Sequence, residues 1–173
     1  MTARIVTEEV KPLGVEGHWL SIHDGDARAL AIFKRHYSYR HRAHGQLRGN
    51  ATFVGQGEKV VLLTLDCRAL FVWQLSTVTR YDGQEGVRCS VFRNEGPLLS
   101  SMLILEAEEL AWQRWLGKRL FTYVWDAKVK SVNPGYCFKM AGWKTCGRNK
   151  DGRLTILEKW PPHGEGRYHG EEV

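Results

Sequence analysis

The sequence predicts an α/β domain built around one mixed sheet. One observation is the order of segments after residue 58, which read as a hairpin, a strand, a helix, a strand, a short helix and a terminal hairpin. A second is the length of 173 residues, which suits one domain with a substantial core. A third is that no internal repeat or linker divides the chain. We therefore expect a single domain over residues 1–160 and a disordered tail over 161–173.

The N-terminal part is polar and carries few structural signals. Ala3–Glu8 and His18–Leu20 have the pattern of short extended segments. Asp24–Tyr37 is predicted to be a helix, because apolar residues recur at helical spacing and either of its first two aspartates can cap it. Gly45–Gly57 is rich in glycine and is expected to form a loop that could cover a site.

The extended segments share runs of aliphatic, β-branched and aromatic residues bounded by turn residues. We predict strands at Glu58–Asp66, Ala69–Leu75, Val87–Gly96, Arg119–Trp125, Lys144–Cys146 and Leu154–Glu158. The first two are separated by a tight turn and should form a hairpin, and the last two should form another.

A longer helix is predicted between the third and fourth of these strands. Ser100 or Ser101 can cap it, and it should continue to Trp115. Apolar residues lie on one of its faces, and the acidic residues of its first half suit the helix dipole.

A short helix is predicted after the fourth strand. Asn133 suits its capping position and Pro134 its first position, while Gly142 stands where the helix must end. Tyr136 then falls in its first turn, near the C-terminal end of the preceding strand. That edge is where open α/β sheets bind ligands.

The composition is that of a soluble globular protein with an excess of positive charge. Hydrophobic residues make up 43% and charged residues 25%, and no apolar run is long enough to span a bilayer, so we expect a cytoplasmic protein without a membrane partner. The net charge of +6 favours an anionic partner such as nucleic acid or a phosphorylated cofactor. The four cysteines show no CxxC spacing, so free thiols are expected.

A basic and aromatic segment begins at the end of the first predicted helix. Basic side chains contact phosphates and aromatic rings stack on exposed bases, so the segment fits a nucleic-acid surface. A solvated loop with two buried tyrosines explains the same residues. The candidates for binding nucleic acid are Lys34, Arg35, Tyr39, Arg40 and Arg42.

From residue 58 to 160 the chain resembles the GNAT acyltransferase superfamily. The resemblance rests on a strand, the motif N-P-G-Y-x-F-x-x-A-G-W that begins at Asn133, and a further strand. It implies that the strands at 87–93 and 119–125 splay apart around the pantetheine arm of acetyl-CoA, and that Tyr136 is a general acid beside the thioester sulfur. The implied cofactor-binding residues are Phe92, Arg93, Gly96, Ser100 and Ser101.

The loop expected to hold the cofactor phosphates departs from the usual pattern of that superfamily. It keeps Arg93 and Gly96 but lacks a second glycine, and Pro97 removes an N–H donor. The helix N-terminus that follows the loop still favours an anion.

Within the superfamily, the chain from His36 to Glu158 resembles the divergent phage DNA-modification branch typified by Mom. The resemblance implies conversion of adenine in double-stranded DNA to an N6-carbamoylmethyl form, which protects phage DNA from restriction. Acetyl-CoA and a bound iron are associated with this branch. The catalytic residues that it implies are His36, Tyr37, Ser101, Asp126 and Tyr136. Of these, His36, Tyr37 and Asp126 are of the types that ligate a metal.

Two other functions remain open at this point. One is a GNAT-type acetyl-CoA-dependent N-acetyltransferase acting on a small amine or a protein, and the other is a degenerate GNAT fold that only binds DNA. A DNA-modifying enzyme would have to flip the base into a pocket, where Tyr37, Tyr39 or Trp73 could stack on it. The oligomeric state is also open, a dimer included.

Overall fold

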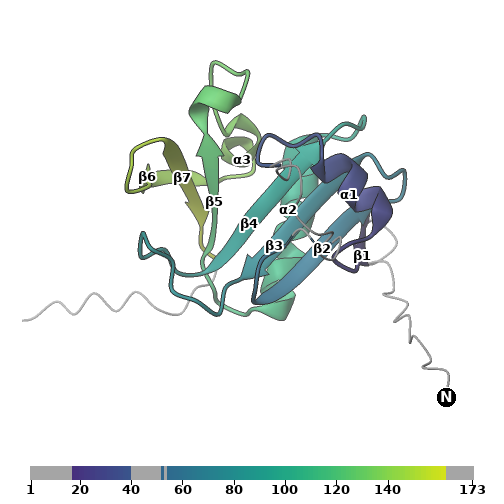
Figure 1. Ribbon diagram of the computed structural model, residues 1–173, viewed down its shortest axis with the longest axis horizontal. Coiled ribbons are helices and arrows are strands. Elements are labelled where there is room, and N and C mark those ends of the chain that lie inside the picture. The colour runs from purple at the N-terminus through teal and green to yellow at the C-terminus, as the bar shows by residue number, and fades with distance from the viewer. Residues whose placement is uncertain (1–16, 40–51, 53, 163–173) are drawn as a thin grey trace, which may run out of the picture.

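The computed structural model describes residues 17–39, 52 and 54–162. Over these residues the chain is an α/β domain with a seven-stranded mixed sheet flanked by a few helices, as predicted (Figure 1). The predicted strand at Ala3–Glu8 and most of the predicted tail lie outside the described residues. No helix in the described part is long and apolar enough to cross a membrane.

The sheet has the strand order β1-β2-β3-β4-β5-β7-β6. The six strands predicted after residue 58 are all present, with ends within two residues of those expected. The bounds are β1 Trp19–Ile22, β2 Glu58–Thr64, β3 Ala69–Leu75, β4 Val87–Asn94, β5 Leu120–Trp125, β6 Lys144–Arg148 and β7 Leu154–Lys159.

Strands β4 and β5 are the one parallel pair of this sheet, and they pair over a short length. Only Val87–Cys89 and Leu120–Thr122 are in register, although β4 continues to Asn94 and β5 to Trp125. On its other side, β5 pairs with β7 along its whole length. The two central strands therefore separate beyond their first three residues, and they diverge toward the top of Figure 1.

A β-bulge lies in β4 at the point of separation. Val72 of β3 pairs with Val91, and Trp73 pairs with Cys89, so Ser90 is an extra residue in β4. A bulge bends its strand and increases the local twist. This gives a physical reason for β4 to leave β5 at Cys89.

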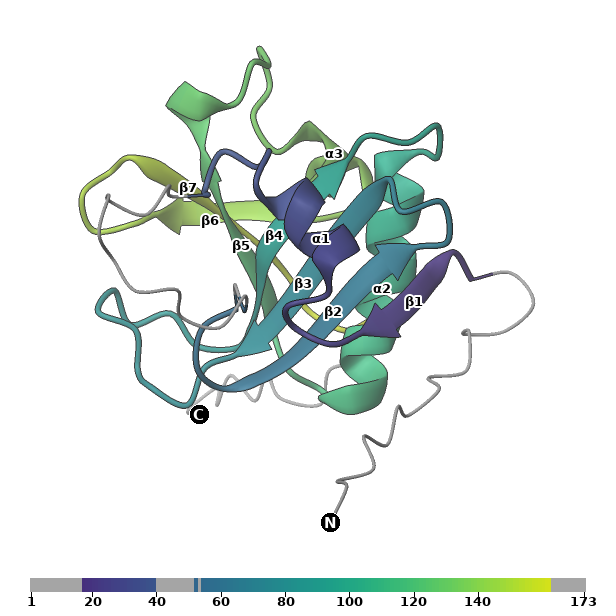
Figure 2. The same cartoon turned by 45° about the vertical axis from the view of Figure 1, so that its right-hand side comes forward.

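The helices cover both faces of the sheet. Helix α1, Ala27–Phe33, lies on one face, whereas α2, Ser100–Arg114, and α3, Tyr136–Met140, lie on the other (Figure 2). A 3-10 turn, η1, follows β5 at Asp126–Lys128. Each face therefore has its own core, one between α1 and the sheet and one beneath α2 and α3.

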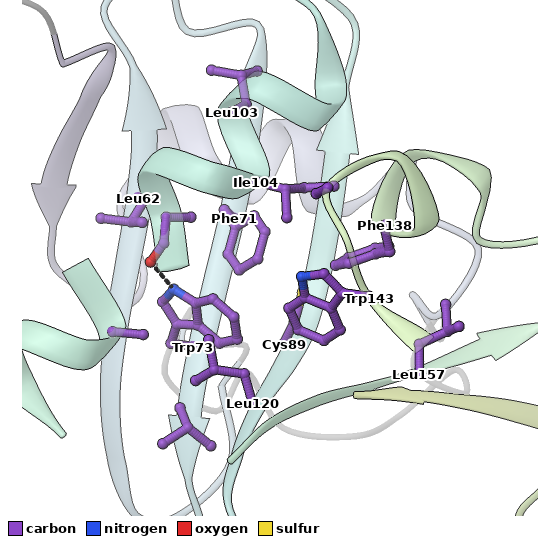
Figure 3. Close-up of a cluster of buried hydrophobic side chains, with 14 of the residues drawn as sticks. Leu62, Phe71, Trp73, Cys89, Leu103, Ile104, Leu120, Phe138, Trp143 and Leu157 are labelled. Atoms are coloured by element: carbon purple, nitrogen blue, oxygen red, sulfur yellow. Dashed lines mark hydrogen bonds between the residues drawn. The ribbon is translucent and has the colours of Figure 1, made fainter. Parts of the chain in front are cut away.

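The core beneath α2 combines aliphatic and aromatic side chains (Figure 3). Trp73 is fully buried, and its indole N–H donates to the Ala107 carbonyl at 2.8 Å. Trp143 stacks against Trp73 with 6.3 Å between ring centroids, and Phe138 of α3 meets Trp143 edge-on at 4.9 Å. Large rings thus support the sheet beside the separating strands, where backbone pairing is missing.

Helix α1 is shorter than the predicted Asp24–Tyr37. Asp26 caps it by accepting the Arg28 amide at 2.9 Å, so the helix begins later than its first aspartate. At the other end, His36 N–H donates to the Phe33 carbonyl at 2.9 Å, which closes a tight turn instead of a further helical turn. His36 and Tyr37 consequently lie in this turn rather than in the helix.

The predicted caps of α2 and α3 are wrong. Helix α2 starts after Leu99 and has no side-chain cap, because the Ser100 hydroxyl accepts from the Asn94 side chain at 3.0 Å. Helix α3 is preceded by Gly135 in the left-handed region, with φ of 76°, and the Asn133 side chain accepts from Lys139 instead of capping. The predicted stop at Gly142 is confirmed by its φ of 89°.

Candidate functional site

A pocket of about 240 Å³ lies where β4 and β5 separate. It has four walls: the end of β4, the end of β5, the start of α3, and the turn that follows α1. The residues that line it are His36, Tyr37, Cys89, Ser90, Val91, Phe92, Arg93, Thr122, Tyr123, Val124, Val129, Gly135, Cys137 and Phe138. The structure thus brings together His36, Tyr37, Phe92 and Arg93 from the residues predicted by sequence.

His36 is buried and is held in one tautomer. The Ser38 amide donates to its Nδ1 at 3.2 Å, and the Ser38 hydroxyl lies 2.7 Å from the same atom. The ring also forms a hydrogen bond with the backbone of Phe92 in β4, which favours a proton on the other ring nitrogen. Burial and the neighbouring Arg93 guanidinium lower the pKa of His36 to about 4, so the ring is neutral at neutral pH.

Tyr37 reaches the opposite strand. Its hydroxyl lies 3.5 Å from the Tyr123 carbonyl and also interacts with the backbone of Trp125, so it contacts β5 beyond the paired region. Burial of the hydroxyl raises the pKa of Tyr37, which keeps the phenol protonated at neutral pH. Two consecutive residues therefore bridge the separated strands, with His36 on β4 and Tyr37 on β5.

A second, larger cavity of about 620 Å³ adjoins this pocket and shares His36, Tyr37, Cys89, Ser90 and Tyr123 with it. We call it the basic groove. Its cationic and aromatic lining residues are Arg80, Tyr81, Arg88, Tyr123, Trp125, Lys128 and Arg153. Asp151 also lines it and is paired with Arg153 at 3.4 Å. The groove therefore combines positive charge with flat rings, which suits an anionic aromatic ligand.

Two thiols that were not predicted from the sequence face the pocket. Cys89 of β4 and Cys137 of α3 both line it, and burial raises the pKa of each thiol. Tyr136, the predicted general acid, is 54% exposed and is not part of the lining. Which residue of a short helix faces the pocket depends on how the helix is rotated about its axis. A shift of one residue changes the answer, and the sequence pattern does not specify it.

The loop predicted to bind cofactor phosphates is organised by Glu95. Arg35 donates two hydrogen bonds to its carboxylate, at 2.8 and 2.7 Å, and Arg93 donates a third at 2.5 Å. These hydrogen bonds lower the pKa of Glu95 to about 2, and the bond from Arg35 contributes more than the bond from Arg93. Two arginines predicted to contact different ligands thus converge on one carboxylate.

Asn94 fixes the conformation of the same loop. It accepts the Gly96 amide at 3.0 Å and donates to the Leu98 carbonyl at 2.7 Å. Gly96 therefore uses its N–H within the loop. Ser100 and Ser101 lie in the first turn of α2, where amide groups have no carbonyl partner in the helix.

Asp126 does not line the pocket, although its carboxylate is among the groups that raise the pKa of Tyr37. One of its carboxylate oxygens accepts from Arg148 at 3.1 Å and from Thr155 at 2.9 Å, and the other is buried without a hydrogen-bond partner. The nitrogens of His36 are already engaged by Ser38 and Phe92. His36, Tyr37 and Asp126 thus do not present a common set of free donor atoms, and in this arrangement they do not fit an iron ion.

The predicted nucleic-acid residues are only partly described. Lys34 and Arg35 follow α1 and are exposed, and Tyr39 meets Phe33 edge-on at 5.4 Å. Arg40 and Arg42 lie outside the described residues. The basic groove instead draws its cations from other elements. One of these cations, Arg88, lies within β4, where buried and half-buried residues alternate.

In comparisons with known proteins, no family model, no curated protein and no solved structure matches this chain. The interpretation of the site therefore rests on its own geometry and on the resemblance carried by the sequence motifs.

Proposed function

We propose that this chain is a GNAT-like transferase that binds an acyl-CoA between β4 and β5 and modifies adenine in double-stranded DNA. The observation that carries the proposal is the separation of the one parallel strand pair after three residues, with a pocket at the opening and His36 and Tyr37 across it.

The separated strands are suited to an extended arm that carries amide groups. Backbone groups of β4 and β5 that face the gap lack the partners that a continuous sheet would supply. A pantetheine arm can pair with them as an added strand does. Val91, Phe92 and Val124 provide the apolar lining that such an arm needs. An acyl-CoA, when bound, supplies an activated acyl group.

The fit is weaker where the phosphates of that cofactor would lie. Ser100 and Ser101 at the start of α2 supply amide donors, and Arg93 supplies a cation. The Glu95 carboxylate works against phosphate binding, because it already accepts a hydrogen bond from Arg93. Cofactor affinity should therefore be modest unless Arg93 turns away from Glu95.

Tyr37 is the residue best placed to act on a reacting group. Its phenol is protonated and lines both the pocket and the basic groove, so it lies between the donor and the acceptor in this proposal. It can donate a hydrogen bond or a proton there. His36 is neutral and anchored to β4, so its role is to fix the turn that carries Tyr37.

The basic groove is suited to a flipped adenine. Its volume of about 620 Å³ accommodates a nucleotide, and Tyr81 and Trp125 offer rings for stacking. Arg153 and Lys128 lie in the same lining and can contact the flanking phosphates. The product implied by the resemblance is N6-carbamoylmethyladenine. Its new bond joins adenine N6 to a methylene carbon, so direct transfer of an acetyl group from CoA to N6 does not form it, and the amide nitrogen needs a further donor.

A second candidate is an N-acetyltransferase acting on a small amine or a protein. It is favoured by Asp151, whose carboxylate lines the groove and can hold an ammonium group. This function needs the same acyl-CoA pocket but no DNA.

The test is mass spectrometry of nucleosides from DNA of cells that express the protein. We expect a new adenine nucleoside with the wild type. Tyr37→Phe should reduce its amount by at least about 10²-fold, which is the lower limit of the rate gain from general acid–base catalysis. Tyr136→Phe is the informative companion: pocket geometry predicts that it stays active, whereas the family resemblance predicts its loss.

If the DNA is unmodified and the protein consumes acetyl-CoA in the presence of amines, the second candidate function is correct and the first is wrong. Absence of CoA binding by the folded protein in calorimetry would contradict both.

A further inference from the structure

Arg88 lies in the central strand of the sheet and is half-buried. In register it faces Gln74 of β3 and Phe121 of β5. Its neighbours Val87 and Cys89 belong to the core beneath α2, so its own side chain projects to the opposite face. Its guanidinium donates to the Gln74 side chain at 2.6 Å, and it forms no ion pair with a carboxylate among the described residues.

This arrangement is energetically costly for the folded protein. A guanidinium carries five N–H donors, and one side-chain amide satisfies only part of them. Arg88 is half-buried, so part of its hydration is lost, and it forms only one hydrogen bond to a side chain among the described residues. In agreement, partial burial and the nearby Arg80 lower the pKa of Arg88, although the Asp82 carboxylate acts in the opposite direction. A fold that keeps such a charge has a use for an anion at that point.

The surroundings of Arg88 are open and positive. Arg88 and Arg80 both line the basic groove and a second cavity of about 270 Å³, so they lie where these two cavities meet. Arg80 donates to the Tyr123 hydroxyl at 2.9 Å and lies 3.5 Å from Asp82, which partly compensates its charge. Lys118 adds a cation to the smaller cavity, and Glu85 adds one acid.

We propose that Arg88 and Arg80 together bind a phosphate group at the junction of these two cavities. Guanidinium groups match phosphate oxygens through paired N–H donors, and a phosphate would provide the acceptors that Arg88 lacks. The assignment to a phosphate of the DNA backbone rests on the proposed function. A free phosphate or nucleotide has the same chemistry, and the experiment separates these sources.

The experiment is calorimetry with two probes, inorganic phosphate and a short double-stranded DNA. Arg88→Met removes the guanidinium and keeps an apolar stem of similar length. Arg114→Gln is the matched control, because it removes one positive charge from α2 on the opposite face, where Arg114 pairs with Glu58.

We expect Arg88→Met to weaken binding of both probes by about tenfold or more, the usual scale for a charge-assisted contact. It should also reduce the salt slope of DNA binding by about 1. Arg114→Gln should change neither. Thermal unfolding without ligand should show that both variants are folded, with a lower midpoint for Arg88→Met because the buried Gln74 side chain loses its donor.

Each other outcome has a definite meaning. Phosphate binding that depends on Arg88 without any DNA binding keeps the phosphate site but defeats the DNA function. If Arg88→Met changes the affinity for neither DNA nor phosphate, the proposed phosphate site is wrong, and the proposed function is unaffected. An Arg88→Met variant that does not fold shows that Arg88 has a structural role and overturns the site as well.

Discussion

The two ends of the β4–β5 pair are held together in different ways. At the paired end, Val87 and Leu120 are fully buried beneath α2, and the Thr122 hydroxyl donates to the Cys89 carbonyl at 3.0 Å as the last link between the strands. At the separated end, side chains of His36 and Tyr37 contact the strands in place of a backbone partner.

The difference shows how a sheet can be opened without collapsing. Backbone pairing satisfies donors and acceptors locally, but it leaves no room for a ligand. Aromatic packing supports the opened strands from one face, and polar side chains occupy part of the gap. The separated end is therefore both the less regular part of the sheet and the part able to bind another molecule. Three substitutions test this comparison.

Removing Phe138 should break the support of the separated end. Phe138 is 6% exposed and meets Phe92 at 5.8 Å and Trp143 at 4.9 Å. Phe138→Ala should lower the free energy of unfolding by about 3–5 kcal/mol, as expected for a buried ring. Urea denaturation measures this loss. Val132→Ala, at a fully exposed position nearby, should change it by less than about 0.5 kcal/mol. Equal effects of the two variants would contradict the comparison.

His36 should make the stability of the separated end depend on pH. Its pKa is about 4 in the folded chain and 6.5 in the unfolded chain, so between these values the unfolded state binds more protons. Stability should therefore rise as the pH increases from about 4 to 6.5 and then level off. The contribution is at most about 3 kcal/mol.

The measurement is the free energy of unfolding of wild type and His36→Gln across that pH range. All other titrating groups are common to both proteins, so the difference between the two curves isolates His36. The variant should lose most of the rise. Parallel curves would mean that the imidazole is not held neutral against β4.

The smallest of the three effects is expected for Glu95, which lies in the loop where the phosphates of CoA are proposed to bind. It holds Arg93 at 2.5 Å, which competes with any anionic ligand. Glu95→Gln should strengthen CoA binding about two- to fivefold, in keeping with the small free energy of a partly exposed ion pair. Calorimetry with CoA measures it, and Glu109→Gln on α2 is a control for the change in net charge. Unchanged or weaker binding in Glu95→Gln would remove Glu95 as the competitor.

Local patterns in the sequence predicted the elements of the sheet well. The hairpin of residues 58–75 and the long helix after residue 99 were found because apolar spacing and turn residues are short-range signals. Helix ends were less predictable. Ser100 was available as a cap, but its hydroxyl bonds to Asn94, and that competition involves the fold of the preceding loop.

The candidate site was predicted in part. His36, Tyr37, Phe92 and Arg93 were selected from sequence and do line the pocket. Cys137 was missed in favour of Tyr136, although the two are adjacent. Sequence spacing identified the short helix but not the side it presents to the pocket, because packing of Phe138 against Phe92 and Trp143 sets that rotation.

The sequence by itself determined which segments form strands and helices, since those depend on neighbours within a few residues. Only the tertiary structure decided that β4 and β5 pair over three residues and then part. It also decided that Arg93 meets Arg35 at Glu95, and that Arg88 is left without an acid. These outcomes depend on contacts between residues far apart in the chain, where the bulge in β4, the turn after α1 and the loop before α2 meet. No local pattern carries that information.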